Sequence, residues 1–235
     1  MSLAVPAGLA VRGFTPPLRL ADYGLVAFDM DSTLINIECV DEIAAAAGLK
    51  AEVAAITEAT MRGEIADFKE SLRRRVALLA GVPESALHQI AQHAMRLNPG
   101  VENFVAAARS AGLVTLLVSG GFTFFSDRVA RWLRIDRTRA NVLEIVDGRL
   151  TGRLVPQPWG DICDGAEKKR TLLAACAELG IAPERAIAVG DGANDLPMMG
   201  AAGLSIAFHA KPAVREKAML AINEGGMDLA LQILR

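Results

Sequence analysis

Two short apolar runs, far apart in the chain, each lead into a cluster of acidic side chains. Residues 25–28 (Leu-Val-Ala-Phe) precede Asp-Met-Asp-Ser-Thr at 29–33, and residues 186–189 (Ala-Ile-Ala-Val) precede Gly-Asp-Gly-Ala-Asn-Asp at 190–195. Apolar runs of this length are typical of strands buried in a parallel sheet. Such sheets bind ligands at the carboxyl ends of their strands, where buried carboxylates are costly without a cation. The pattern predicts an α/β protein with an acidic, cation-binding site at one sheet edge.

From Gly24 onward, apolar strand candidates alternate with longer segments of helical periodicity. This alternation is typical of a parallel sheet with helical crossovers. We expect strands at 24–29, 113–118, 186–190, 203–208 and, from a weaker pattern, 218–222. We expect helices at 101–111, 122–134, 167–179 and 227–234.

Two segments depart from this alternation. Residues 36–98 contain only helix signals, at 37–47, 50–61, 67–80 and 84–97, and predict a helical cap inserted after the first strand. Residues 142–154 carry Asp147-Gly148 between two β-prone runs, which indicates a hairpin. The predicted organisation is an irregular N-terminal extension over 1–22 that ends in a short edge strand, an α/β core over 23–35 and 99–235, and a cap over 36–98.

Composition excludes several classes of function. The 235 residues are 52% hydrophobic and carry a formal net charge of −2, so no basic surplus predicts binding to nucleic acid or to an anionic membrane. No apolar stretch is long enough to predict a membrane span, and the N-terminus does not resemble a signal peptide. Three widely spaced cysteines indicate reduced thiols, and we expect a cytoplasmic protein.

The first acidic motif has the groups needed for phosphoryl transfer. The carboxylate of Asp29 could attack phosphorus and form an aspartyl-phosphate, which divides one difficult displacement into two easier ones. The carboxyl group of Asp31 could protonate the leaving oxygen and later deprotonate water. Thr33 and the amides of the turn could donate to phosphoryl oxygens. The alternative is a polar turn whose Ser32 or Thr33 caps a helix.

Two further segments could bind an anion. Ser119-Gly120-Gly121 follows the strand candidate at 113–118 and offers a hydroxyl and unhindered amides near a helix N-terminus, although it is also an ordinary loop sequence. Lys168, at the start of a predicted helix, could neutralise charge between nucleophile and phosphate. Lys169 and Arg170 follow it directly, and the sequence does not distinguish the three.

The second acidic motif is the more specific one. Asp191 comes directly after a strand candidate, and Asn194 and Asp195 lie in the same glycine-flanked turn. Mg²⁺ prefers oxygen ligands and often shares the phosphate oxygens of a substrate. We expect Asp191 to be a ligand, with Asn194 and Asp195 orienting waters or neighbours. The ligand spacing of a Ca²⁺-binding loop is absent.

One cationic side chain falls on an apolar helix face. In the predicted helix at 67–80, Phe68, Leu72, Val76 and Leu79 form a single stripe at 100° per residue, and Arg75 lies in its middle. A charge on such a face needs a partner, and a substrate carboxylate would provide a bidentate one. An internal salt bridge and a side chain that extends to solvent are the alternatives.

Taken together, these motifs strongly resemble those of the haloacid dehalogenase superfamily of phosphotransferases. The resemblance covers about residues 23–232 and implies a Rossmann-like parallel sheet with a small helical-bundle cap after the first strand. The matching core segments are 29–34, 118–122, Lys168 and 189–195, and the matching cap segments are 41–44 and 71–76. The cap segments resemble the serine-forming branch of the superfamily.

The resemblance implies a role for each matching residue. Asp29 is implied to be the nucleophile and Asp31 the general acid and base, with Thr33 and Asp195 in support. Mg²⁺ is implied to be bound by Asp29, Asp191 and the main-chain carbonyl of Asp31. The implied substrate-binding residues are Ser119, Gly120, Gly121, Lys168 and Asn194 for the phosphate, Glu38 for the ammonium, Arg75 for the carboxylate, and Met61 and Phe68 for a lid that excludes water.

The implied activity is a Mg²⁺-dependent hydrolysis of O-phospho-L-serine to L-serine and phosphate, the last step of serine biosynthesis. A related enzyme for another small phosphorylated amino acid, such as phosphohomoserine, is one alternative. A phosphoacceptor signalling module is another, although such modules are about half this length and need no cap. The expected partners are the small-molecule substrate and, in a homodimer, a second copy of the chain.

Overall fold

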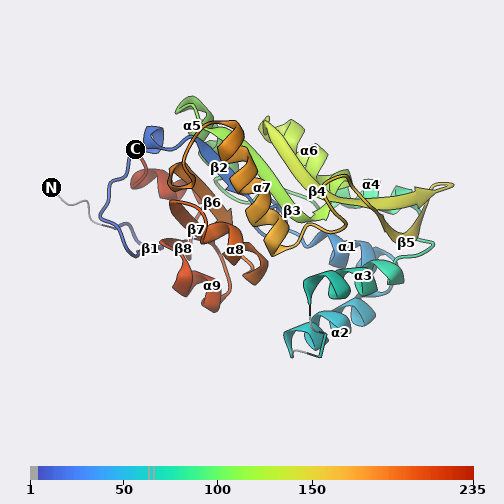
Figure 1. The fold of residues 1–235 in the computed structure, drawn as a ribbon. Helices are drawn as coiled ribbons and strands as arrows, with labels where there is room; N and C mark the ends of the chain where they lie inside the picture. The colour runs from blue at the N-terminus through green and yellow to red at the C-terminus, as the bar shows by residue number, and fades with distance from the viewer. Residues whose placement is uncertain (1–4, 63, 66) are drawn as a thin grey trace.

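The structure is a computed structural model that describes residues 5–62, 64–65 and 67–235. Its centre is an eight-stranded sheet with the order β1-β8-β7-β6-β2-β3-β4-β5 (Figure 1). The strands are β1 (Leu9–Val11), β2 (Leu25–Phe28), β3 (Val114–Phe122), β4 (Arg137–Val146), β5 (Arg149–Val155), β6 (Ala186–Gly190), β7 (Leu204–Phe208) and β8 (Leu220–Ile222). The six inner strands run parallel, and only the outer strands β1 and β5 pair antiparallel. The predicted α/β class with a mainly parallel sheet is confirmed.

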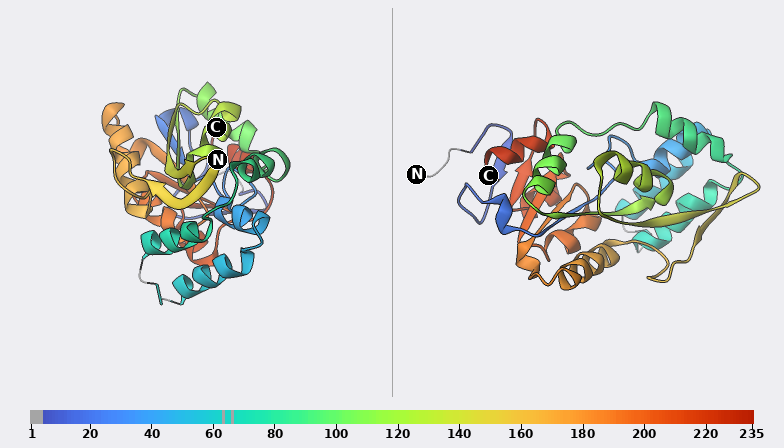
Figure 2. Two further views of the ribbon diagram at one scale, coloured as in Figure 1. Left: turned by 90° about the vertical axis from the view of Figure 1, so that its right-hand side faces the viewer. Right: turned by 90° about the horizontal axis from the view of Figure 1, so that it is seen from above.

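Helices cover both faces of this sheet. The α-helices are α1 (Cys39–Ala46), α2 (Lys50–Met61), α3 (Phe68–Leu78), α4 (Glu84–His93), α5 (Val101–Ser110), α6 (Thr123–Leu133), α7 (Gly165–Glu178), α8 (Leu196–Met199) and α9 (Pro212–Lys217). Short 3-10 helices form at η1 (Leu20–Asp22), η2 (Pro183–Arg185), η3 (Ala193–Asp195) and η4 (Met227–Gln232). Helices α5 and α6 pack with η4 on one face, and α7, α8 and α9 pack on the other (Figure 2).

Alternation along the strands assigns each side chain to one of two apolar layers. In β2, Val26 and Phe28 belong to the layer that includes α5, where the ring of Phe28 meets that of Phe104 edge to face. Leu25 and Ala27 belong to the layer that includes α7 and α8. All four β2 side chains are buried, which explains why this strand is a continuous apolar run.

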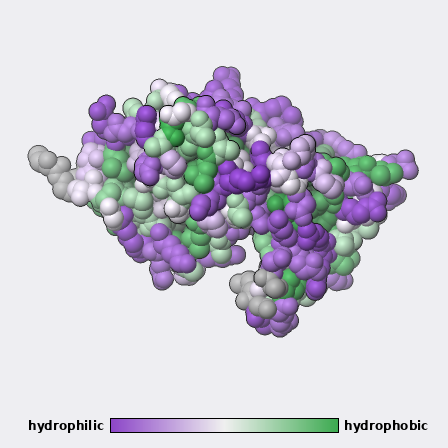
Figure 3. Space-filling model, in the orientation of Figure 1, coloured by the Kyte–Doolittle hydropathy of each residue, from purple (hydrophilic) through white to green (hydrophobic). Residues whose placement is uncertain are grey.

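Four helices, α1 to α4, lie between β2 and β3 in the chain. In Figure 1, α1, α2 and α3 lie below the hairpin of β4 and β5, away from the main body of the sheet. The end of the hairpin bonds to the connection between α3 and α4 and to the start of α4: Gly81 N donates to Leu150 O at 2.7 Å, and Glu84 N, at the first residue of α4, donates to Gly148 O at 2.8 Å. The space-filling view is indented along its lower edge, between the main body and the part that contains α2 (Figure 3). The boundaries of extension, core and cap stay a prediction.

One local prediction at the site is wrong. The sequence predicts a strand that ends at 118, a loop at Ser119–Gly121 and a helix from 122, but β3 continues through this segment to Phe122. Phe122 pairs with Asn141 of β4, after a register shift that follows Val118. Glycines favour loops because of their local freedom, whereas here pairing with the neighbouring strand decides the conformation.

Other boundaries also differ from the sequence-based expectation. The edge strand of the N-terminal extension is predicted near residue 22. In the structure this strand is β1 at 9–11, because these residues pair with β8. The helix expected at 227–234 is the 3-10 helix η4. Strand β4 begins at Arg137, before the predicted hairpin, because its first half pairs parallel with β3. Helices α8 and α9 were not predicted. Among the described residues, no helix has the length and apolar character needed to cross a membrane.

Candidate active site

The sheet register brings the two acidic motifs together. Phe28 of β2 lies between Leu117 of β3 and Val189 of β6, so β2 and β6 reach their carboxyl ends at nearly the same level, and β3 continues past them to Phe122. The pairing continues one residue further, because Asp29 N donates to Val189 O at 2.9 Å. Asp29 and Asp191, 162 positions apart in the sequence numbering, therefore leave adjacent strands at one edge of the sheet.

A buried lysine lies between two of these carboxylates. Lys168 Nζ is 2.7 Å from Asp29 Oδ1 and 2.6 Å from Asp195 Oδ1, and its side chain is fully buried. Burial alone would lower the pKa of Lys168, but attraction to Asp195 and Asp29 raises it above the ordinary value. Lys169 and Arg170 are exposed. The structure thus distinguishes the three adjacent cations, and only the first reaches the acidic cluster.

Asp195 organises the turn after β6. Its Oδ1 faces Lys168, while its Oδ2 accepts from the amides of Asp191 at 3.1 Å and Gly192 at 3.0 Å. The close packing requires glycine at 190, since a Cβ there would lie 2.4 Å from Asp195 Cγ. Both oxygens of Asp195 are therefore engaged by the protein, which suits the supporting role that the sequence predicts for it.

Three carboxylates at this edge form a cluster suited to a cation. Ligand atoms of Asp29, Asp191 and Asp195 lie within 4.8 Å of one another. Burial, and then repulsion from Asp195, raise the pKa of Asp29 well above its ordinary value and that of Asp191 to about 6. Thr33 Oγ1 donates to Asp191 Oδ1 at 3.0 Å and orients that carboxylate. An all-oxygen donor set with more negative charge than Lys168 offsets fits a hard divalent cation such as Mg²⁺.

The second aspartate of the first motif is held by the start of α1. Asp31 Oδ2 accepts from Cys39 N at 2.9 Å, and Asp31 Oδ1 accepts from Cys39 Sγ at 3.1 Å. Burial, with repulsion from Glu38 as the next cause, raises the pKa of Asp31 to about 7. A carboxyl group with such a pKa can both give and take a proton near neutral pH.

The end of β3 forms a further wall of the site. Ser119 Oγ accepts from Gly121 N at 2.9 Å. A Cβ at Gly121 would lie 3.1 Å from Ser119 Oγ and 3.2 Å from Asp31 Oδ1, so this strand end packs directly against Asp31. A Cβ at Gly120 would lie 2.8 Å from Phe68 Cζ. The first residue of α3 therefore reaches the strand end across the interface between the helical insertion and the sheet.

Three predicted residues remain besides Arg75: Glu38, Asn194 and Met61. Glu38 precedes α1 and accepts from Ser32 Oγ at 2.6 Å. Asn194 lies on η3, in the same turn as Asp191. Met61 ends α2, and its side chain is outside the part of the chain that the structure describes.

Arg75 is the half-buried cation that the helical stripe predicts. Arg73 and Arg74 on the same helix are exposed. Arg75 Nε is buried without a hydrogen-bond partner, and among the described residues no carboxylate lies within salt-bridge distance of its guanidinium. Burial lowers the pKa of Arg75, while the charges of Asp41 and Glu38 act in the opposite direction. The predicted alternative of an internal salt bridge is thus not seen within the described chain.

Sequence reasoning missed two asparagines that hold the site together. Asn98 Nδ2 donates to the carbonyls of Ser32, Thr33 and Ile35 at 3.2, 3.0 and 3.0 Å. Asn141, buried in β4, donates to Gly120 O at 2.8 Å. A polar residue inside a β-prone run is a signal that could have identified Asn141, whereas the position of Asn98 before Pro99 indicates only the end of a helix.

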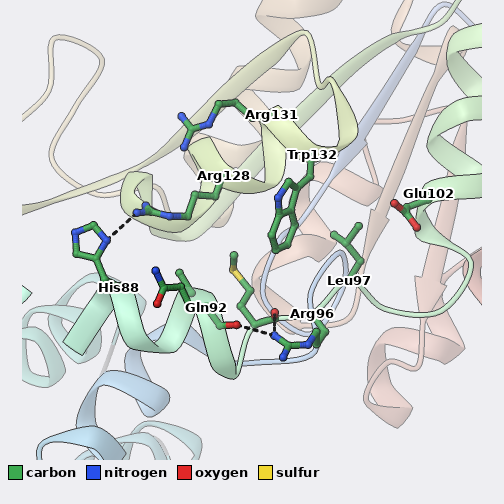
Figure 4. A pocket seen from close by; sticks show the side chains of 10 residues that line it. His88, Gln92, Arg96, Leu97, Glu102, Arg128, Arg131 and Trp132 are labelled. Atoms are coloured by element: carbon green, nitrogen blue, oxygen red, sulfur yellow. Dashed lines mark hydrogen bonds between the residues drawn. The ribbon is translucent and has the colours of Figure 1, made fainter. Parts of the chain in front are cut away.

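A separate cavity of about 860 Å³ opens between α4, the segment after it and α6 (Figure 4). Its lining includes His88 of α4 together with Arg128, Arg131 and Trp132 of α6. Figure 4 shows Arg128 directed toward His88, with 3.2 Å between Nη2 and Nδ1. None of the predicted site residues lines this cavity, so the acidic cluster and not this cavity is the candidate active site.

Comparisons with known proteins agree with this geometry. The family of haloacid dehalogenase-like hydrolases matches residues 26–200. The phosphoserine phosphatase of Albidiferax ferrireducens is 67% identical over 99% of this chain and 98% of its own, and that of a Polaromonas species is 66% identical over 97% of each. A solved phospho-aspartyl intermediate analogue of phosphoserine phosphatase superposes with a TM-score of 0.82 at 37% identity, covering 91% of this chain and 99% of that one. The chain therefore belongs to the family of haloacid dehalogenase-like hydrolases.

Proposed function

We propose that the protein hydrolyses O-phospho-L-serine to L-serine and phosphate through an aspartyl-phosphate on Asp29. The observation that carries this proposal is the ion-paired triplet of Asp29, Lys168 and Asp195 at one sheet edge, with the carboxyl of Asp31 next to it. Near-full-length identity to phosphoserine phosphatases supports the choice of substrate.

In the first step, a carboxylate oxygen of Asp29 attacks the phosphorus atom of the substrate. The bond between phosphorus and the seryl oxygen breaks, and Asp31 gives its proton to that oxygen, which leaves as the serine hydroxyl. Lys168 faces Asp29 and reduces the repulsion between the carboxylate and the phosphoryl oxygens. The amides near Gly120 and Gly121 can donate to those oxygens.

In the second step, Asp31 takes a proton from water as the water oxygen attacks phosphorus. The bond between phosphorus and Asp29 breaks, and both carboxyl groups return to their starting states. A pKa of about 7 lets Asp31 act in both directions. This pair of steps favours turnover over storage of the phosphoryl group, and so it disfavours a signalling module.

Mg²⁺ is the proposed cofactor, and the residues that would hold it are Asp29, Asp191 and the main-chain carbonyl of Asp31. When bound, the ion would stabilise the negative charge of the phosphoryl group. The raised pKa values of Asp29 and Asp191 support this assignment, because they arise first from burial and then from repulsion by Asp195, and a cation would offset both costs of the charged carboxylates. Asp195 would act behind these ligands, since its two oxygens already accept from the protein.

The amino-acid end of the substrate would lie toward the helical insertion. Arg75 would pair with the substrate carboxylate, which would provide the partner that its buried Nε lacks. Glu38 would pair with the ammonium group. Phe68 and Met61 would exclude water, and Phe68 already lies against the strand end at Gly120.

A substrate panel with one matched pair of variants tests this proposal. Phosphate release is measured from phosphoserine, phosphohomoserine and phosphosugars in the presence of Mg²⁺. We expect phosphoserine to be preferred and Arg75→Ala to raise its KM about 10- to 100-fold, the loss of one charge-assisted hydrogen-bond pair. The exposed neighbour Arg74, which pairs with Glu70, is the control, and Arg74→Ala should be silent. Preference for another substrate, or an unchanged KM in Arg75→Ala, would contradict the assignment.

Two further expectations accompany this function. We expect a cytoplasmic enzyme, since Cys39, Cys163 and Cys176 are all buried free thiols in the described structure. We also keep a homodimer as a proposal, which sedimentation velocity of the purified protein tests directly.

A further inference from the structure

A cysteine supplies both hydrogen bonds that hold Asp31. Cys39 is the first residue of α1 and is fully buried. Its main-chain N lies 2.9 Å from Asp31 Oδ2, and its Sγ lies 3.1 Å from Asp31 Oδ1. Among the described residues, no other group donates to this carboxyl. One residue thus engages the two oxygens from two different donors.

This arrangement restricts the rotation of the Asp31 carboxyl group. With a single donor, the terminal χ2 torsion of an aspartate would keep a broad distribution of angles. A donor at each oxygen selects one orientation of the carboxyl group. Gly121 lies near the same carboxyl, since a Cβ at this position would come within 3.2 Å of Asp31 Oδ1. The orientation of the carboxyl plane is therefore set by the two donors of Cys39.

We propose that Cys39 is a positioning residue, whose thiol orients Asp31 for proton transfer to and from the reacting oxygen. The inference rests on the proposed function, because it assigns a means of support to the general acid and base of that reaction. The thiol does not contact the reacting atoms and forms no covalent bond.

Three substitutions separate hydrogen bonding from packing. Cys39→Ala removes the donor and some volume, Cys39→Val removes the donor but fills the space, and Cys39→Ser keeps a donor. The main-chain N–H bond to Asp31 persists in all three. The thiol is a weak hydrogen-bond donor, so its loss should lower kcat about 10-fold, which corresponds to a typical single hydrogen bond.

The assay measures kcat and KM for phosphoserine, with an aryl phosphate as a second substrate. We expect Cys39→Ala and Cys39→Val to lose about 10-fold in kcat with KM changed less than about twofold, and Cys39→Ser to recover most of the rate. The aryl leaving group needs no proton from Asp31. The variants should therefore lose less rate in phosphoryl transfer from the aryl phosphate, measured as the pre-steady-state burst, than in turnover of phosphoserine. Thermal melts of each variant show whether rate follows stability instead.

Two results would overturn the proposal. One is an unchanged kcat in Cys39→Ala and Cys39→Val. The other is a kcat of Cys39→Ser as low as that of Cys39→Ala. Such a result would show that restoring a hydrogen-bond donor does not restore the rate, as expected if Cys39 acted only through packing. Failure of the proposed function has a different signature: wild-type protein would then hydrolyse the aryl phosphate but not phosphoserine.

Discussion

Replacing Lys168 by methionine should destabilise the fold in a pH-dependent way. The change keeps the length and apolar character of the side chain but removes the cation between Asp29 and Asp195. Both carboxylates are buried, so the variant contains two adjacent negative charges with little access to water. Breaking a buried ion pair by removing one partner costs about 3–5 kcal/mol.

The magnitude depends on whether Asp29 can take up a proton. Burial raises its pKa, and Lys168 opposes that shift, so the variant raises the pKa of Asp29 further. A carboxyl group with a raised folded-state pKa binds protons more tightly in the folded than in the unfolded chain, so stability increases as pH falls. We expect a loss of about 3 kcal/mol at pH 7.5, equivalent to roughly 6–12 °C in Tm, and a smaller loss at pH 5.5.

Urea unfolding followed by circular dichroism, in EDTA and at both pH values, measures this effect. The control is Lys169→Met, which removes an exposed charge one residue away and should change the unfolding free energy by less than about 0.5 kcal/mol. The reasoning is refuted if Lys168→Met costs less than about 1 kcal/mol at pH 7.5, or if its cost is the same at the two pH values.

Three further predictions concern the metal, the pH response and the loop after β2. EDTA should abolish phosphate release and added Mg²⁺ should restore it; full activity in EDTA would exclude the proposed cofactor. Between pH 8 and pH 5, the metal-free protein should gain about 1.4 kcal/mol of unfolding free energy relative to Asp191→Asn, because the folded-state pKa of Asp191, about 6, exceeds that of the unfolded chain. Asp31, whose pKa is about 7, contributes equally to both proteins and cancels in this comparison. Equal slopes in denaturant titrations of the two proteins would contradict this. Asn98→Ala removes a donor to three loop carbonyls and should cost about 2 kcal/mol in stability and about 10-fold in kcat/KM; unchanged values in both measurements would remove Asn98 from the account.

The sheet and its acidic edge could be predicted because their signals are local. Strands buried on both faces are continuous apolar runs, and the carboxylates follow them directly, as at Phe28 and Asp29. Parallel pairing then places the strand ends together without further information. The placement of Arg75 could also be predicted from the sequence, because helical periodicity distinguishes it from the exposed Arg73 and Arg74.

Contacts between distant segments could not be predicted in this way. The choice of Lys168 over its neighbours depends on how α7 is rotated against the sheet, which periodicity leaves open among three adjacent cations. The strand conformation of Ser119–Phe122 depends on pairing with Asn141, 19 residues beyond Phe122 in the numbering. The bonds of Asn98 to the loop after β2 depend on where the chain returns from the helical insertion.

Acid quenching during turnover of phosphoserine tests the central claim most directly. Mass spectrometry of the digested protein should find one phosphoryl group, on the peptide that contains Asp29, and hydroxylamine should remove it. Asp29→Asn should show neither the modified peptide nor phosphate release. A phosphoryl group on another residue would contradict this mechanism. Rapid turnover by wild-type protein without modification of Asp29, or rapid turnover by Asp29→Asn, would contradict it as well.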